Sequence, residues 1–261
     1  MHNAMSAEEI FEHNSAMLPE RGILISFEGG DGSGKGTQTT MFAEHLQKIG
    51  IQVLKSGYPM YDTPTGKEVA DYLNGRMGND VSAEVAGKLF TDDRLANNGP
   101  IEDHVRAGGV GLLDRYVESN SGHQGGKIPT KEGRVKYILN NARIEYEENG
   151  LMVPDLTFLF TLEPELAKEY VAKKMQRSYT NLSHDIHEND PFHLKNANEA
   201  FMLLPELYPE RFKHIDITTE NGLEMRSREE IIADIIHAAK PLFTSKGYIL
   251  PDYKLRYEVS E

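Results

Sequence analysis

The segment from Ile23 to Gln38, ILISFEGGDGSGKGTQ, most constrains what this chain can fold into. An apolar, β-rich run ends at Phe27 in a glycine-rich loop, and a segment with helical character follows. Within the loop, Gly29-x4-Gly34-Lys35 has the spacing of a phosphate-binding loop. Its glycines allow tight turns and let backbone N–H groups point at phosphate oxygens. The positive end of the following helix favours the same anion. The segment predicts a strand–loop–helix unit that binds a nucleoside triphosphate.

The residues after the loop glycines raise a question about the metal ion. Lys35 adds a mobile positive charge for the β- and γ-phosphates. Gly36 stands where a serine or threonine normally offers a hydroxyl to magnesium, and Thr37 comes one place later. Magnesium would then be held through water and phosphate, which suits its reluctance to lose its hydration shell. Thr37 is the alternative hydroxyl ligand.

Composition narrows the classes of protein that this chain can form. The 261 residues include no cysteine, which excludes disulfides and thiolate metal sites and fits a reducing cytoplasm. No apolar run approaches the roughly 20 residues of a membrane span, and the N-terminus lacks a signal-peptide pattern. The net charge of −13 argues against a broad nucleic-acid-binding face, but not against a small basic pocket. We expect a cytoplasmic protein without membrane or nucleic-acid partners.

Strand and helix patterns alternate along the chain. We expect strands at 23–27, 51–54, 108–113, 156–162 and 212–217, and helices at 37–49, 64–75, 83–97, 131–148, 163–177 and around 231–236. This order predicts an α/β fold in which helices cover both faces of a mainly parallel sheet. Without an internal repeat or linker, residues 21–241 are expected to form one domain. Residues 1–20, with a capping box at Ser6 and Glu9, form an N-terminal extension, and 242–261 a C-terminal one.

One long polar stretch interrupts this alternation. Residues 178–193, SYTNLSHDIHENDPFH, lack clear periodicity and are many for a passive connection. Their length favours a mobile lid that covers a binding site. An ordinary surface loop is the alternative.

Three segments gather charged residues where an α/β sheet binds its ligands, at the carboxyl ends of its strands. They are the phosphate-binding loop, Phe90 to Arg94, and Asp114-Arg115-Tyr116. By itself, Asp114-Arg115 fits a structural ion pair. Beside a phosphate-binding loop it also fits phosphoryl transfer, which needs magnesium, lysine and arginine around the moving group. Arg115 is planar and can bridge two phosphates.

The order of several motifs resembles one enzyme family. FEGGDGSGKGTQ, YPMYDTPTG, LFTDDR, DRYVESNSGHQGGKI and PDLTFLFTLEPELA follow one another as in thymidylate kinases, P-loop enzymes that transfer the γ-phosphoryl group of ATP to dTMP. The likeness runs from about Ile23 to Ala239, although Gly34 to Gln38 looks more like adenylate kinase. The resemblance implies a three-layer P-loop kinase fold with a central five-stranded parallel sheet, helices on both faces and a mobile lid. It also implies ATP as donor, Mg²⁺ and a homodimer.

On the donor side, the resemblance implies roles for the phosphate-binding loop and for residues beyond it. The ATP phosphates would be held by Gly29, Gly30, Asp31, Gly32, Ser33, Gly34, Lys35, Gly36 and Thr37. Asp114 would organise magnesium through water. Because Gly32 and Ser33 are small, the chain resembles the class that takes its catalytic arginine from the lid, which favours Arg177. A solvated basic helix end is the alternative for Arg177. The catalytic set is Lys35, Arg115, Asp31 and Arg177.

On the acceptor side, the resemblance implies a nucleotide pocket. Phe90 would stack on thymine and Arg94 would donate to a thymine oxygen, while Asp31 would face the sugar 3′-hydroxyl and Arg115 would clamp the phosphates. His123 would crowd the sugar 2′ position. Core packing for Phe90 and a surface position for His123 are the alternatives. The expected acceptor residues are Asp31, Tyr61, Phe90, Arg94, Arg115, Ser119, His123 and Gln124.

Two features keep other functions open. The Tyr58-Pro59-Met60-Tyr61 loop lacks the arginine that the family usually carries there, and Gly36 lacks a hydroxyl. The altered loop, together with His123, makes a kinase for another nucleotide or for a deoxynucleoside one alternative. A nucleotide-binding regulatory protein that has lost catalysis is another, against which Lys35, Asp114 and Arg115 argue.

Overall fold

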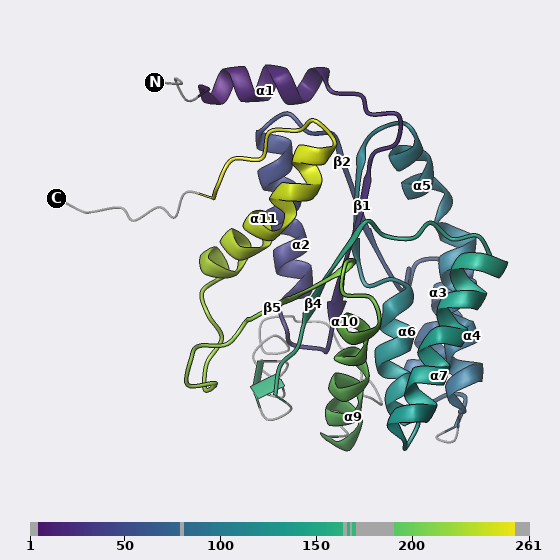
Figure 1. Ribbon diagram of the computed structural model, residues 1–261. Coiled ribbons are helices and arrows are strands. Elements are labelled where there is room, and N and C mark those ends of the chain that lie inside the picture. Colours follow the sequence, from purple (N-terminus) through teal and green to yellow (C-terminus); the bar gives the residue numbers. More distant parts are fainter. Residues whose placement is uncertain (1–4, 79–80, 164–165, 168, 171–190, 254–261) are drawn as a thin grey trace.

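A five-stranded parallel sheet forms the centre of the molecule (Figure 1). The computed structural model describes residues 5–78, 81–163, 166–167, 169–170 and 191–253. The strands lie in the order β2-β3-β1-β4-β5. Their bounds are β1 Ile23–Gly29, β2 Val53–Gly57, β3 Val110–Asp114, β4 Leu156–Phe160 and β5 Phe212–Ile215. The predicted parallel α/β sheet is confirmed, with β2 and β3 shifted about two residues later than expected.

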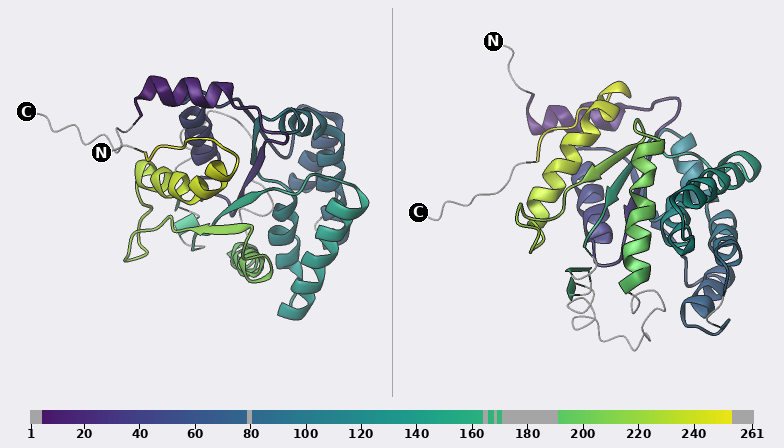
Figure 2. Two further views of the ribbon diagram at one scale, coloured as in Figure 1. Left: turned by 45° about the horizontal axis from the view of Figure 1, so that its top comes forward. Right: turned by 60° about the horizontal axis from the view of Figure 1, so that its bottom comes forward.

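Alternation along β1 divides the interior into two cores, because successive side chains point to opposite faces of a strand. Ile23, Ile25 and Phe27 pack in one core with α2 (Lys35–Lys48) and α11 (Arg228–Ser245). Leu24 faces the other side, where Ile101 and Val105 of α5 (Gly99–Arg106) cover it. Figure 2 shows α2 and α11 together on one face of the sheet and the blue and teal helices α3 to α7 on the other.

The second face carries most of the helices. The predicted helices at 64–75 and 83–97 are present as α3 (Pro64–Leu73) and α4 (Ala83–Asn97). The sequence patterns did not reveal α5, α6 (Val117–His123), α9 (Pro191–Phe201) or α10 (Leu203–Leu207). A short 3₁₀ turn, Gly125–Lys127, follows α6. Phe201, Leu203 and Leu204 join Leu159 and Phe212 in a third cluster over β4 and β5.

The helix expected at 131–148 changes its geometry part-way. α7 (Lys131–Ala142) is α-helical, and Arg143–Glu148 continue it as a π-helical segment, η2. Such wider turns are rare and often occur at functional sites. Here the segment carries the carboxylate of Glu145 into the interior, where its side chain is fully buried.

Two expected elements fall largely outside the described residues. Of the helix expected at 163–177, Leu166 and Ala167 are described and are buried in the core under α2 and α11. Of the lid expected at 178–193, residues 178–190 lie outside the described part, while 191–193 open α9. Within the described ranges, none of the helices has the length and apolar character that a membrane crossing requires.

The two ends of the described chain meet at the amino edge of the sheet. The predicted capping box of Ser6 and Glu9 starts α1 (Ala7–Ala16), which lies along the top of Figure 1. Asn14 of α1 is 2% exposed. Its Nδ2 donates to the carbonyl oxygens of Ile49 and Ile249, both at 2.9 Å, and its Oδ1 accepts from the N–H of Ile249 at 2.9 Å. One amide therefore joins α1, the end of α2 and the chain after α11.

We expect Asn14→Ala to lower the free energy of unfolding by roughly 2–4 kcal/mol, because it leaves three backbone groups of Ile49 and Ile249 without their partner. For a chain of this size the melting temperature should fall by about 5–10 °C. Urea unfolding measures the effect. Asn149→Ala is the matched control, since Asn149 is exposed and should change stability by less than about 0.5 kcal/mol. Equal effects of the two substitutions would contradict the prediction.

Candidate active site

The predicted phosphate-binding loop connects β1 to α2 as the sequence indicates. β1 ends at Gly29, where φ is 134° and an added Cβ would lie 1.8 Å from the carbonyl oxygen of Phe160, so only glycine fits. Gly34, with φ of 84°, caps α2, and Lys35 is its first residue. The buried Lys35 Nζ donates to the carbonyl oxygen of Gly30 at 2.6 Å. Burial and the charge of Arg115 lower the pKa of Lys35 to about 8, which leaves it mostly protonated at neutral pH.

Arg115 lies at the centre of the site, where β3 ends. Its backbone has a φ of 67°, an uncommon left-handed conformation for a residue with a side chain. The guanidinium donates to the carboxylate of Asp31 in the loop and, at 3.0 Å, to Nε2 of His123. Because a guanidinium can only donate, His123 accepts this bond through an unprotonated Nε2. Burial opposes ionisation of Asp31, but the charges of Arg115 and Lys35 outweigh it and lower the pKa of Asp31. The structure thus brings Asp31, Lys35 and Arg115 together, as predicted.

A buried carboxylate that sequence reasoning missed holds this arrangement. Glu28 of β1 is fully buried and accepts from the backbone N–H of Tyr116 and from Ser119 Oγ, both at 2.6 Å. The N–H of Arg115 donates to the carbonyl oxygen of Phe27 at 3.0 Å. The backbone N–H groups of Arg115 and Tyr116 are therefore both bonded to β1. Burial, followed by the charge of Glu118, raises the pKa of Glu28 to about 7.

The raised pKa of Glu28 predicts a pH-dependent stability. The folded state keeps the proton of Glu28 up to about pH 7, whereas the unfolded chain releases it near the ordinary value of 4.5. The stabilising contribution is therefore complete below pH 4.5 and is lost as the pH rises through 7, amounting to about 3 kcal/mol. In Glu28→Gln, the decline of the unfolding free energy between pH 5 and 7.5 should become shallower in urea titrations. Glu44→Gln, at an exposed position of α2, should keep the wild-type slope. An unchanged slope in Glu28→Gln would refute the assignment.

Asp114 provides a carboxylate at the mouth of the loop. An added Cβ at Gly36 would lie 2.8 Å from Asp114 Oδ2, so the glycine lets the carboxylate approach the first turn of α2. Within the described part of the chain, no donor contacts the side chain of Asp114, and no group of three or more acidic, histidine or cysteine residues forms a metal cage. One free carboxylate beside a phosphate-binding loop fits a hydrated magnesium ion, which binds proteins through one or two carboxylates plus phosphate. Thr37 lies on the same helix turn and stays a predicted ligand.

Next to this cluster lies an open pocket, whose empty volume of about 560 Å³ includes space open to solvent. All eight residues expected on the acceptor side line it, namely Asp31, Tyr61, Phe90, Arg94, Arg115, Ser119, His123 and Gln124. The structure adds five residues that sequence reasoning missed, Tyr58, Pro59, Leu73, Tyr116 and Asn120. Asn120 falls inside the DRYVESNSGHQGGKI motif, and its position three residues before His123 on α6 was the available signal. Arg177, the expected lid arginine, lies outside the described residues.

Phe90 and Arg94 reach the pocket from the helix α4, not from the end of a strand as expected. Phe90 is partly exposed and packs edge-on against Tyr72, with ring centroids 6.1 Å apart. Arg94 is 1% exposed, and its Nε donates to Glu145 Oε2 at 2.7 Å. Helical packing therefore presents one flat ring and one guanidinium to the same pocket.

The Tyr58–Tyr61 loop is fixed in place despite its lack of arginine. Asp93 of α4, which is fully buried, accepts from the backbone N–H of Met60 at 2.9 Å. Tyr58 OH donates to Asn98 Oδ1 at 2.9 Å. Among the described lining residues, Arg94 and Arg115 are the positively charged side chains, and Arg94 is paired with Glu145. Arg115 is thus the guanidinium nearest to the phosphate end of the pocket.

Comparisons with known proteins agree with this geometry. A family model for thymidylate kinase matches residues 27–227. The chain belongs to the thymidylate kinase family. The thymidylate kinase of Lactobacillus helveticus is 32% identical over 206 residues, which cover 76% of this chain and 89% of that protein. The probable thymidylate kinase of Methanosarcina mazei is 29% identical over 218 residues, covering 83% and 94%. The chain is accordingly an ATP-dependent nucleoside monophosphate kinase of the thymidylate kinase type.

A solved structure of thymidylate kinase from Candida albicans has the same fold. The TM-score is 0.64 at 21% sequence identity, and the alignment covers 89% of this chain and 96% of that chain. This likeness confirms the expected P-loop kinase fold with its central five-stranded sheet.

Proposed function

We propose that this enzyme transfers the γ-phosphoryl group of ATP to dTMP, giving dTDP and ADP, in a magnesium-dependent reaction. The observation that carries the proposal is the Asp31–Arg115 pair, which lies where the phosphate-binding loop meets the pocket lined by Phe90 and Arg94. A phosphate held there would lie between the donor site and this pocket. Membership of the thymidylate kinase family supports dTMP as the acceptor.

The proposed residue roles follow from charge and position. Lys35 and the amides at the start of α2 hold the donor phosphates, and Arg115 binds the acceptor phosphate and the transferred group. The phosphate of dTMP is already an ionised nucleophile, so the site needs no strong general base. Catalysis then rests on in-line positioning, on neutralisation of charge and on exclusion of water. Asp114 would hold magnesium through water, and the ion would neutralise charge on the donor phosphates.

The acceptor-side roles are proposed in the same way. Phe90 would stack on the base, and Ser119, His123 and Gln124 would line the nucleoside. His123 is held by Arg115 and packs edge-on against Phe201 at 5.4 Å between ring centroids, which fixes its ring in the pocket wall. This placement supports a role next to the sugar over that of a surface histidine. We also propose Arg177 as the lid arginine and a cytoplasmic location for the enzyme. We further propose a homodimer, which sedimentation velocity would test.

A coupled assay for ADP with ATP and Mg²⁺ tests the function across dTMP, dUMP, dCMP, dGMP, dAMP and thymidine. The proposal expects dTMP to have the highest kcat/KM. A different acceptor is the second candidate, because the Tyr58–Tyr61 loop offers no arginine to the acceptor phosphate. Equal or faster turnover of another acceptor would favour it. ATP binding without turnover of any acceptor would point to a regulatory protein.

A further inference from the structure

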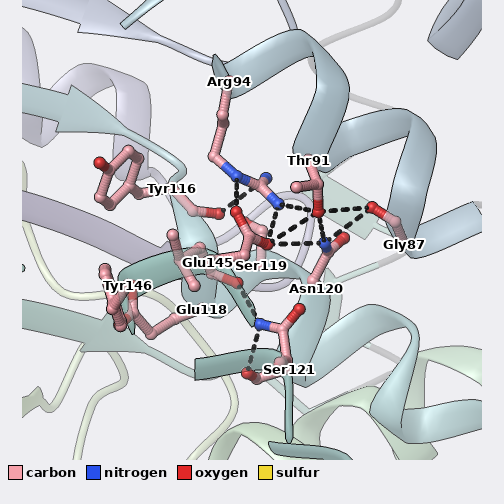
Figure 3. Close-up of polar contacts among 12 residues, drawn as sticks. Gly87, Thr91, Arg94, Tyr116, Glu118, Ser119, Asn120, Ser121, Glu145 and Tyr146 are labelled. Atoms are coloured by element: carbon pink, nitrogen blue, oxygen red, sulfur yellow. Dashed lines mark hydrogen bonds and ion pairs between the residues drawn. The ribbon is translucent and has the colours of Figure 1, made fainter. Parts of the chain in front are cut away.

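The wall of the acceptor pocket contains a carboxylate that does not itself line the pocket. Glu145, on the π-helical segment η2, is fully buried behind Arg94 and Asn120 (Figure 3). Arg94 donates to it through Nε at 2.7 Å and also through Nη2. Asn120 Nδ2 donates to Oε1 at 3.1 Å, as does Thr91 Oγ1. Because Arg94 and Asn120 bind the same oxygen, they lie side by side in the wall.

Glu145, together with the carbonyl oxygen of Gly87, determines which end of the Asn120 amide faces the pocket. Asn120 Nδ2 also donates to the carbonyl oxygen of Gly87 at 3.0 Å. A carbonyl and a carboxylate can only accept, so the amide nitrogen must face them and the oxygen must point away. Asn120 lines the pocket, and no donor among the described residues contacts its Oδ1. Asn120 Oδ1 is therefore a hydrogen-bond acceptor that faces the pocket.

The same carboxylate leaves Arg94 with one donor to offer. A guanidinium has five N–H groups. Nε binds Glu145, Nη2 binds Glu145 and Thr91, and Nη1 donates to the carbonyl oxygen of Tyr116 at 3.2 Å. Within the described ranges, the second N–H of Nη1 has no partner. The wall thus combines one acceptor, on Asn120, with one donor, on Arg94.

We propose that Glu145 is a positioning residue that determines base specificity. It holds Asn120 and Arg94 so that the pocket accepts a base with a ring N–H next to a carbonyl and rejects one with a bare ring nitrogen next to an amino group. Thymine and uracil match this pattern through N3–H and O4. With cytosine, acceptor would face acceptor and donor would face donor, leaving buried polar groups unpaired. This inference rests on the proposed function, because it presumes that the base occupies this pocket.

The simpler interpretation is that Glu145 is only a structural partner of Arg94 that joins η2 to α4. The two interpretations differ in what removal of the charge would do. A structural defect would lower activity toward every acceptor alike. Loss of the fixed amide would lower activity toward 4-keto bases and relieve the penalty against 4-amino bases.

Glu145→Gln separates these outcomes, because glutamine has an NH2 group in place of one acceptor oxygen. Either the oxygen that Arg94 Nη2 and Asn120 share or the oxygen that Arg94 Nε binds is therefore lost. The acceptors to compare are dTMP and 5-methyl-dCMP, which share the methyl group, sugar and phosphate and differ only at the hydrogen-bonding edge. In the wild type, we expect kcat/KM for dTMP to exceed that for 5-methyl-dCMP by about a hundredfold or more. In Glu145→Gln this ratio should fall at least tenfold, with KM for ATP unchanged. An equal loss for both acceptors, or an unchanged ratio, would overturn the proposal.

A matched control and a second variant complete the test. Thr91→Val removes one hydroxyl bound to the same carboxylate and should keep the wild-type ratio. If Glu145→Gln does not fold, the double variants Arg94→Met/Glu145→Gln and Arg94→Met/Glu145→Leu remove both buried charges together, which proteins tolerate better than one unpaired charge. Glutamine can still accept from Asn120 and leucine cannot, so a lower ratio in the leucine variant would support the proposal and equal ratios would overturn it. If the wild type prefers 5-methyl-dCMP or uses both within threefold, this inference fails. If it uses no pyrimidine nucleotide, the proposed function fails first.

Discussion

Replacing Lys35 by methionine should lower kcat for phosphoryl transfer by roughly a thousandfold or more. The Lys35 ammonium is buried at the first turn of α2, where the donor phosphates would bind. Methionine keeps the length and apolar stem of the side chain but removes the charge. The coupled ADP assay at saturating ATP and dTMP measures the loss.

The fold of the Lys35→Met variant should remain intact. Among the described residues, Lys35 Nζ donates hydrogen bonds to two loop atoms, the carbonyl oxygen of Gly30 and Ser33 Oγ, so the bonds lost in the variant lie within the loop. Circular dichroism and the melting temperature check this. Lys48→Met, at the exposed end of the same helix, is the control and should keep activity within about twofold. A folded Lys35→Met enzyme with more than about a tenth of wild-type kcat would contradict the role.

Replacing Arg115 by alanine should cause a loss about as large as that of Lys35→Met, roughly a thousandfold in kcat/KM. The guanidinium joins the loop carboxylate of Asp31 to His123 in the pocket wall. Among the described residues that line the pocket, Arg94 is the other cation that could neutralise the phosphates. Its removal also exposes Asp31 to an acceptor phosphate of like charge, and the pKa of Asp31 should rise because its main partner is lost. Both kcat and KM for dTMP should change, whereas KM for ATP should change less.

The chain offers a control for Arg115→Ala. Arg106→Ala removes an exposed arginine that pairs with Glu102 on α5, outside the pocket, and should leave the kinetics unchanged. Arg115→Lys keeps the charge without the planar fork and should recover only part of the activity. A folded Arg115→Ala enzyme with nearly full activity would refute the role.

Much of the site could be predicted because its parts are local in the sequence. The glycine spacing, Lys35 and the apolar run before them lie within 16 consecutive residues, and their conformations follow from local sterics and a helix terminus. Alternating strands and helices similarly predicted the parallel sheet. The short helices α5 and α6 were missed because their apolar residues are few, and packing on the sheet stabilises them more than their own periodicity does.

Glu28 and Glu145 could not be predicted, since the sequence shows a carboxylate but not its partners. Glu28 lies 88 residues from Tyr116, and Glu145 lies 51 from Arg94. Each is buried only because strand register or helix packing brings distant donors to it. A carboxylate at an arbitrary position is usually solvated, so composition gives no signal of its burial.

The sequence alone determined that this chain binds a nucleoside triphosphate at a strand–loop–helix unit, and its motif order indicated the family. Those features depend on residues close together in the chain. Only the tertiary structure decided how the acceptor pocket is built, because β1, β3, α4, α6 and η2 must pack before Arg115 meets Asp31 and before Glu145 meets Arg94 and Asn120. The phosphate-binding loop is local in the sequence, whereas the hydrogen-bond directions that we propose for the choice of acceptor depend on long-range packing.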